Sequence, residues 1–209
     1  MGELRTSASM TEDSIRATDS PAAQTSPSGC ASGVGISSSH SDKLQWFELC
    51  FRPHFESSVF DPIDRPVSSD DALIGFLLMA CAIDYLAGFW RGESTKGKVS
   101  EAYRGFIDEY FPPDRFDSDG PYDSLRNGLV QMFTIKGKRY SLKHNRPGVH
   151  LRTAHSGQII LNAADFRDDL PSAANSYFED VELDPALLDK LLRRCRRDGF
   201  LALHPIRLT

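Results

Sequence analysis

The sequence predicts a mainly α protein in which four helices form a bundle, a small β element follows, and two further helices close the chain. Three observations support this prediction. Apolar residues recur at helical spacing in successive segments between residues 43 and 135. Short alternating runs then replace this pattern at about 138–162, and amphipathic helical patterns return afterwards. Hydrophobic residues make up 40% and charged residues 25% of the 209 residues, which is typical of a soluble globular protein.

Residues 1–41 are expected to be a disordered tail. They contain eleven serines and no Phe, Trp or Tyr. A stretch of this composition buries too little apolar surface to offset the entropy lost on ordering. We therefore assign residues 42–209 to the folded domain and expect regular structure to begin near Lys43.

The first helix is expected within residues 43–60, where apolar residues follow helical spacing. Its apolar face would carry Leu44, Phe47, Phe51 and Phe55. Pro53 lies inside this segment, and we expect it to limit or kink the helix because proline lacks the N–H donor.

The second helix is the most apolar segment, and it is expected from about Asp70 to Trp90 with an end near Gly92. The residues SSDDALIG supply an N-cap and an acidic first turn. Residues 72–90 nearly match the ~20 apolar residues that cross a bilayer. Asp84 interrupts this run, and a charge in hydrocarbon costs about 2.5–3.5 kcal/mol. We therefore expect a buried core helix and no membrane association.

Two shorter helices are expected next. An apolar stripe predicts a helix within residues 98–113, ended by Pro112-Pro113, and its members are Val99, Tyr103, Phe106, Ile107 and Tyr110. After a turn-rich loop, Pro121 opens a fourth helix with Asp123 in its first turn. The apolar side of this fourth helix is expected to hold Leu125, Leu129, Met132 and Phe133.

The chain then changes to a β pattern. Residues 138–144 alternate like a strand, and residues 149–162 predict a hairpin around Ser156-Gly157. A helix follows with Asn162 as its N-cap and Pro171 in its interior. The last helix has Asp184 as its cap and Pro185 in its first turn, a favourable start.

Charge and cysteine content limit the class of protein. The net charge is −5 and the pI is about 5.7, so overall charge does not indicate nucleic-acid binding, although a local basic patch is compatible with it. The four cysteines form no CxxC pair, which argues against a zinc site and against a disulfide framework. This pattern fits the reducing cytosol, and the N-terminus has no signal-peptide pattern, so we expect a cytoplasmic protein.

Asp84 and Arg126 are the residues with the clearest chemical interest. A buried carboxylate needs a partner or takes up a proton. Asp84 either faces solvent beside a surface lysine or orients a buried arginine. Arg126, followed by Asn127 near a helix start, is suited to grip a phosphate with two parallel hydrogen bonds. Its alternative is an ordinary arginine on a helix surface.

The residues Arg126 to Gln131, read as RNGLVQ, resemble the signature of the HEPN superfamily, in which an arginine precedes a histidine by four to six positions. The run CAIDYLAGFW, with its acid on a preceding apolar helix, also resembles HEPN-like proteins found near mobile elements. The resemblance covers about residues 43–182. It implies a four-helix bundle, a homodimer and a metal-independent RNase ancestry with no cofactor. Other members of the superfamily are non-catalytic and bind nucleotides or partners.

The sequence departs from the HEPN signature at one position, where Gln131 replaces the histidine. Glutamine does not titrate near neutral pH, so it does not exchange a proton with a ribose hydroxyl. General acid–base catalysis contributes about 10²–10⁴-fold, and we therefore expect activity to be lost or strongly reduced. Five residues along an ideal α-helix also separate Gln131 from Arg126 by about 140°. The two would serve one phosphate only at a frayed helix start or across a dimer.

Lys143, His144 and Arg146 are candidates for binding a substrate phosphate, with His150 close by in the sequence. The alternative is a solvated hairpin edge, where charges discourage pairing between sheets. No metal site is expected from His144, His150 and His155, because their spacing is not that of ligands on one strand face. The basic residues of the last helix, at 190–197, either match the helix dipole or track RNA phosphates.

We therefore expect a HEPN-like nucleic-acid-associated protein of the defence type with a degenerate RNase site. The candidate catalytic residues are Asp84, Arg126, Asn127 and Gln131. The alternative is a non-catalytic dimeric binding or scaffold module. A homodimer is expected, with RNA and a protein partner as the other ligand classes, and the pair Asp84–Arg126 is expected to lie in a cleft between the second and fourth helices.

Overall fold

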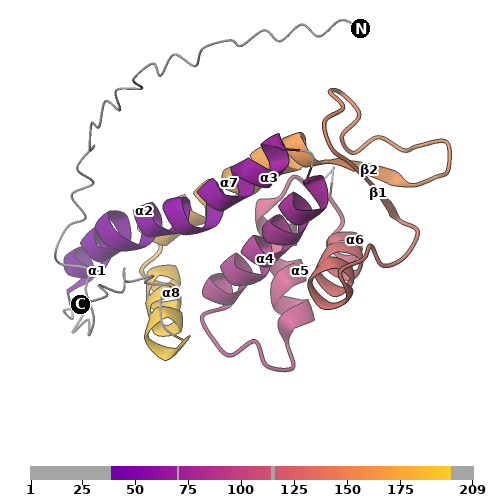
Figure 1. Ribbon diagram of the computed structural model, residues 1–209. Coiled ribbons are helices and arrows are strands. Elements are labelled where there is room, and N and C mark those ends of the chain that lie inside the picture. The colour runs from indigo at the N-terminus through magenta and orange to yellow at the C-terminus, as the bar shows by residue number, and fades with distance from the viewer. Residues whose placement is uncertain (1–38, 70, 114–115, 199–209) are drawn as a thin grey trace, which may run out of the picture. The chain divides into compact units, whose positions relative to one another are not determined.

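The computed structural model describes residues 39–69, 71–113 and 116–198 (Figure 1). The described chain is mainly helical, as predicted, and carries a small two-stranded sheet. Segments of π-helix are labelled η. The elements are α1 (His40–Trp46), η1 (Phe47–Phe51), α2 (Arg52–Phe55), η2 (Glu56–Phe60), α3 (Asp61–Ser68), α4 (Ala72–Arg91), α5 (Val99–Tyr110), α6 (Asp119–Pro121), η3 (Tyr122–Val130), β1 (Tyr140–Lys143), β2 (Ile159–Asn162), α7 (Ala163–Leu183) and α8 (Pro185–Asp198).

The predicted tail, residues 1–41, lies almost entirely outside the described residues. Its boundary is wrong by a few positions, because α1 already begins at His40. The Ser39 side chain explains this start, since its hydroxyl accepts a hydrogen bond from the Asp42 N–H at 3.1 Å and so caps the helix.

A nearly continuous helical segment runs from α1 through η1, α2 and η2 to α3 (Figure 1). Phe47, Phe51 and Phe55 are buried along it, as the periodicity predicted. Pro53 does not end the helix, because it occupies the first turn of α2 directly after π-helical η1. The Phe51 ring meets the Phe89 ring edge-on, with the two centroids 5.0 Å apart, which ties this segment to α4.

Helix α4 lies at the centre of the fold, where α3, α5, η3, α7 and α8 all pack against it. It ends at Gly92, as predicted, with φ at +71°. By length and composition α4 is apolar enough to cross a membrane, and 56% of its most apolar window is buried inside the protein. The surrounding helices give α4 the packing of a core helix.

Helix α5 matches its prediction, whereas the fourth predicted helix differs in type and end. It is the short α6 followed by π-helical η3, which stops at Val130. Met132 and Phe133 were expected on its apolar side and are 62% and 57% exposed. The chain reverses at Phe133, where φ is +52°, so these two side chains lie beyond the packed part of the helix. Thr134 N–H then donates to the Gly128 carbonyl at 3.2 Å.

The β element was predicted to be a hairpin, and this is wrong for its named strands. β1 and β2 pair in parallel, with Tyr140 opposite Ile159 and Lys143 opposite Asn162. The connection, residues 144–158, is long enough to return the chain to the same end, as parallel strands require. The predicted hairpin around Ser156-Gly157 does form: Thr153 and Ile159 make an antiparallel bridge, and hydrogen bonds join the Leu151 N–H to the Ile160 carbonyl at 2.7 Å and the Ile160 N–H to the Arg152 carbonyl at 2.9 Å.

The two closing helices match their predictions. Helix α7 starts after Asn162 and continues through Pro171. Helix α8 starts at Pro185, where the Asp184 carboxylate accepts from the Ala186 N–H at 2.8 Å. Cys81 and Cys195 are free thiols. Cys50 is disulfide-bonded, a bond that the spacing of the cysteines did not predict.

Substituting Gly92 tests the contact between the end of α4 and α8. A Cβ at Gly92 would lie 2.5 Å from the Lys190 Cβ, and the positive φ disfavours any side chain. We expect Gly92→Ala to lower the free energy of unfolding by about 2–4 kcal/mol in urea denaturation. The matched control is Gly97→Ala, which has φ +73° but nothing within 4 Å, and which should lose only about 1–2 kcal/mol. Equal losses would show that Lys190 imposes no packing constraint.

Candidate functional site

The candidate site is centred on Asp84, which lies on α4 one turn beyond Cys81. A long run of apolar residues forms α4, and Asp84 is the acidic residue within this helix. Its carboxylate is 32% exposed, so it is neither fully buried nor free in solvent. Partial burial raises the pKa of Asp84, and the positive charges of Arg126 and Arg194 oppose this rise.

Arg126 pairs with Asp84, as the sequence predicted. The Arg126 Nε lies 3.6 Å from the Asp84 Oδ2, and the arginine side chain is 16% exposed. This distance allows an ion pair but exceeds that of a good hydrogen bond. Consistent with this, the buried Nε has no hydrogen-bond partner among the described residues. The pair joins α4 to η3.

Asn127 extends this pair along η3. The Arg126 Nη1 donates to the Asn127 Oδ1 at 3.4 Å, and the Asn127 Nδ2 donates to the Asp123 Oδ1 at 3.3 Å. The polar chain therefore runs from Asp84 through Arg126 and Asn127 to Asp123. The hydrogen bond between Arg126 and Asn127 holds the guanidinium in its orientation toward the Asn127 amide.

The π-helical form of η3 changes the relation between Arg126 and Gln131. A π-helix links each residue to the one five positions on, so residues at this spacing follow one another on the same face. Gln131 stands five positions after Arg126, as the C-cap of η3, and its side chain is exposed. The separation of about 140° expected for an ideal α-helix therefore does not apply here.

Two neighbours of the pair were missed from the sequence. Tyr103 on α5 is fully buried, and its hydroxyl has no hydrogen-bond partner in the described part of the chain. Burial and the nearby Asp84 charge hold the pKa of Tyr103 well above its usual value. Arg194 on α8 contacts Gly88, one turn from Asp84, and its Nη1 donates to the Glu93 carbonyl at 2.9 Å. Both looked in the sequence like members of ordinary amphipathic helices.

The basic residues of α8 are partly used within the protein. The Arg197 Nη2 also donates to the Glu93 carbonyl at 2.9 Å, and Arg194 pairs with Asp198. Leu188, Leu191, Leu192 and Cys195 are buried on the opposite side. These contacts favour the interpretation of α8 as a packing helix over that of an RNA-tracking surface.

The predicted phosphate ligands lie on the β element instead of beside Arg126. Lys143 ends β1, and Arg146 is exposed in the connection that follows. The His144 Nε2 is hydrogen-bonded to the Val67 carbonyl at 2.9 Å, so this ring attaches the connection to the end of α3. For Lys143 and Arg146, no ion pair with Asp84 or any other described acid is present.

Both ring nitrogens of His150 form hydrogen bonds within the protein. Its Nε2 donates to the Asp169 carboxylate at 2.9 Å, and its Nδ1 accepts from the Asn162 N–H at 3.1 Å. The side chain is only 4% exposed. His150 is therefore a structural residue and is not free to act beside Gln131. Among the described residues, no group of three or more His, Cys, Asp or Glu side chains could hold a metal ion.

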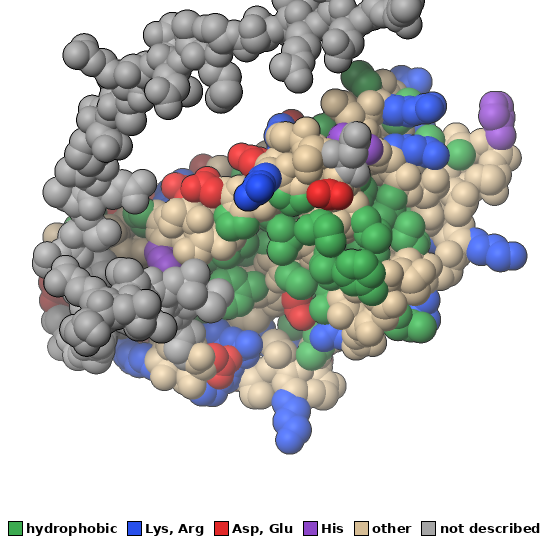
Figure 2. Space-filling model, viewed as in Figure 1, with side chains coloured by type: hydrophobic (Ala, Val, Ile, Leu, Met, Phe, Trp, Pro, Cys, Tyr) green, Lys and Arg blue, Asp and Glu red, His purple; other side chains and the backbone are tan. Residues whose placement is uncertain are grey.

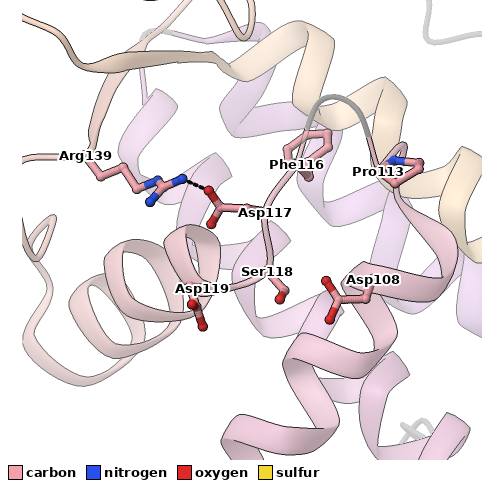
Figure 3. A pocket seen from close by; sticks show the side chains of 7 residues that line it. All are labelled: Asp108, Pro113, Phe116, Asp117, Ser118, Asp119 and Arg139. Atoms are coloured by element: carbon pink, nitrogen blue, oxygen red, sulfur yellow. Dashed lines mark ion pairs between the residues drawn. The ribbon is translucent and has the colours of Figure 1, made fainter.

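Two of the cavities formed by the described residues differ in size and character. The larger, about 550 Å³, is lined by Asp108, Ser118, Asp119 and other residues, and Figure 3 shows Asp117 in it paired with Arg139. The Asp117 carboxylate also accepts from the Gly120 N–H, so it is occupied as a loop cap. The smaller cavity, about 310 Å³, is mainly apolar and is lined by Ser58, Val59, Pro62, Leu78, Cys81, Ala82 and Tyr85. Neither is lined by Asp84 or Arg126.

Comparison with known proteins found no family model, no curated protein and no solved structure that matches this chain.

A double-mutant cycle measures how strongly Asp84 and Arg126 are coupled. Each single change, Asp84→Ala or Arg126→Ala, leaves a partly buried charge without its partner, and we expect losses of about 1–3 kcal/mol in the free energy of unfolding. The double variant should lose less than the sum by about 0.5 kcal/mol or more. Urea denaturation of the four proteins checks this. Strict additivity would mean that the 3.6 Å approach carries no energy.

Proposed function

We propose that this chain is a HEPN-like protein derived from a metal-independent RNase, with a degenerate hydrolytic site and a remaining nucleic-acid-associated role. One observation carries the proposal. The arginine of the RNGLVQ segment lies 3.6 Å from an acid on the preceding apolar helix, as expected for a partly buried charge that needs a partner. An arginine on an exposed helix face would not be expected to lie beside this partly buried acid.

The register of η3 supports the same proposal. A π-helix puts position 131 next to Arg126 on one helix face, which is where a proton-transferring residue must stand to share a phosphate with the arginine. In this chain the position holds Gln131, which carries no titratable proton. The nearby groups do not replace it: burial raises the pKa of the Cys81 thiol and of the Tyr103 hydroxyl, so both stay protonated at neutral pH.

Restoring the histidine tests this function. We expect the wild-type chain to show little or no metal-independent cleavage of a fluorogenic RNA, and Gln131→His to raise the rate by about 10²–10⁴-fold. Adding Arg126→Ala to Gln131→His should remove that gain, because the phosphate would lose its guanidinium. EDTA in every assay excludes contaminating metal-dependent nucleases.

The matched control is Met132→His, which places a histidine at an exposed site one residue away, off the Arg126 face. It should leave the rate at the wild-type level. Equal gains from Gln131→His and Met132→His, or a Gln131→His rate that Arg126→Ala leaves unchanged, would contradict the proposal.

A second candidate, the non-catalytic dimeric module, is favoured by an apolar surface on α4. The residues that face outward recur every three or four positions and are nearly all apolar: Leu73, Ile74, Leu77, Leu78 and Cys81. Figure 2 shows apolar side chains gathered over the region of α3 and α4. The 310 Å³ cavity opens beside Cys81. A contiguous apolar surface of this kind marks a contact with another molecule, and a second copy of the chain is the occupant that the resemblance implies.

A charge on this surface tests self-association. We expect the wild-type chain to sediment as a dimer at tens of micromolar, and Ile74→Lys to sediment as a monomer because the lysine would bury a charge at the interface. The control is Leu183→Lys, which changes a residue 82% exposed at the end of α7 and should leave the dimer intact. A monomeric wild type would refute the dimer without affecting the RNase ancestry.

A further inference from the structure

The β element and its flanks carry a strongly asymmetric charge. Residues 134–164 contain six Lys or Arg and no Asp or Glu, whereas the whole chain has a net charge of −5. All six cations are exposed: Lys136, Lys138, Arg139, Lys143, Arg146 and Arg152. His155, also exposed, adds a seventh group that becomes cationic at mildly acidic pH. A local excess of positive charge attracts anionic ligands to this segment, although the protein as a whole is acidic.

Four of these cations have no acidic partner among the described residues. Arg139 pairs with Asp117, and Lys136 lines a small cavity together with Asp119 and Asp123. For the other four, Lys138, Lys143, Arg146 and Arg152, no ion pair occurs within residues 39–69, 71–113 and 116–198. Figure 2 shows Lys and Arg side chains standing out at the end of the molecule where β1 and β2 lie in Figure 1.

The segment that holds the cations is fixed to the helices. His144 binds the Val67 carbonyl, the Arg146 N–H donates to the Asn162 Oδ1 at 2.8 Å, and buried His150 binds Asp169. Leu161 is fully buried beneath the sheet. The backbone that carries the cations is therefore ordered before any ligand arrives, and binding loses less conformational entropy than it would on a flexible loop.

We propose that this segment, the basic β element, is a nucleic-acid-binding surface that contacts the phosphate backbone of an RNA strand through Lys138, Lys143, Arg146 and Arg152. The distribution of apolar groups favours this ligand over an anionic membrane. The large exposed hydrophobic residues of the described chain lie outside 134–164, with Met132 and Phe133 directly before it, so the four cations have no such group between them to insert between lipids. Backbone phosphates need only exposed donors and positive charge.

The proposal deepens the nucleic-acid-associated role given above, but it rests on the placement of charge and not on the Arg126 site. His144 and His150 attach the segment to the helices, and the lysines and arginines contact the phosphates. The arrangement gives affinity with little sequence preference, because phosphate contacts position a strand without reading its bases.

The test is fluorescence anisotropy of a labelled single-stranded RNA titrated with the full chain at several KCl concentrations. The wild type should bind, with log K falling linearly against log salt by about 0.7 for each phosphate contacted. The double variant Lys143→Glu/Arg152→Glu should bind about tenfold more weakly with a shallower slope. The matched control, Lys96→Glu/Lys98→Glu, makes the same charge change at two exposed lysines between α4 and α5 and should bind like the wild type.

Repeating the charge reversal in the Arg126→Ala protein separates this surface from the proposed RNase site, since Lys143→Glu/Arg152→Glu should weaken RNA binding there by the same factor of about ten as in the wild type if the two regions act independently. Absence of RNA binding at low salt would overturn the proposal, as would equal weakening by both double variants. A parallel sedimentation assay with phosphatidylserine vesicles gives the remaining outcome. Vesicle binding that Lys143→Glu/Arg152→Glu removes, without RNA binding, would assign the basic β element to membranes and refute the nucleic-acid proposal.

Discussion

The arrangement of the described chain depends on the burial of α4. Five elements, which are spread along the chain from α3 to α8, each bury an apolar side against this helix. Close approach needs small residues at the contacts, and α4 supplies them: a Cβ at Gly75 would lie 2.7 Å from Val67, and Gly88 lies under the Arg194 guanidinium. Packing on α4 therefore also fixes the positions of the side chains and loops that these neighbouring elements carry.

The polar site follows from the same constraint. A helix surrounded in this way leaves an acid at position 84 partly desolvated, so the carboxylate favours a neighbouring cation. Arg126 on η3 and Arg194 on α8 belong to two different elements packed on α4, and both favour the charged form of Asp84. The basic β element is positioned independently, through the hydrogen bond of His144 to the end of α3 and that of His150 to Asp169 on α7. The protein thus presents two polar regions of different character on one scaffold.

The features that the sequence predicted correctly are mainly those that local residue patterns determine. The spacing of Phe47, Phe51 and Phe55 identified a buried helix face, and the residues around Gly92 and Asp184 marked helix ends, because caps and stripes are local properties. The pairing of Asp84 with Arg126 was also predicted, since a charge on an apolar helix demands a partner. The strand direction in the β element was missed, because the parallel pairing of Tyr140 with Ile159 is set by long-range contacts. Tyr103 and Arg194 were missed for the same reason.

The π-helical form of η3 has a consequence for chain length. A π-helix fits one more residue into each turn than the α-helix hydrogen-bond pattern would hold, and tertiary contacts such as the chain reversal over Gly128 hold that extra residue in place. Losing a single residue between Arg126 and position 131 would let the segment relax to an α-helix and rotate everything beyond it. The number of residues in this turn is therefore as much a part of the site as their identity.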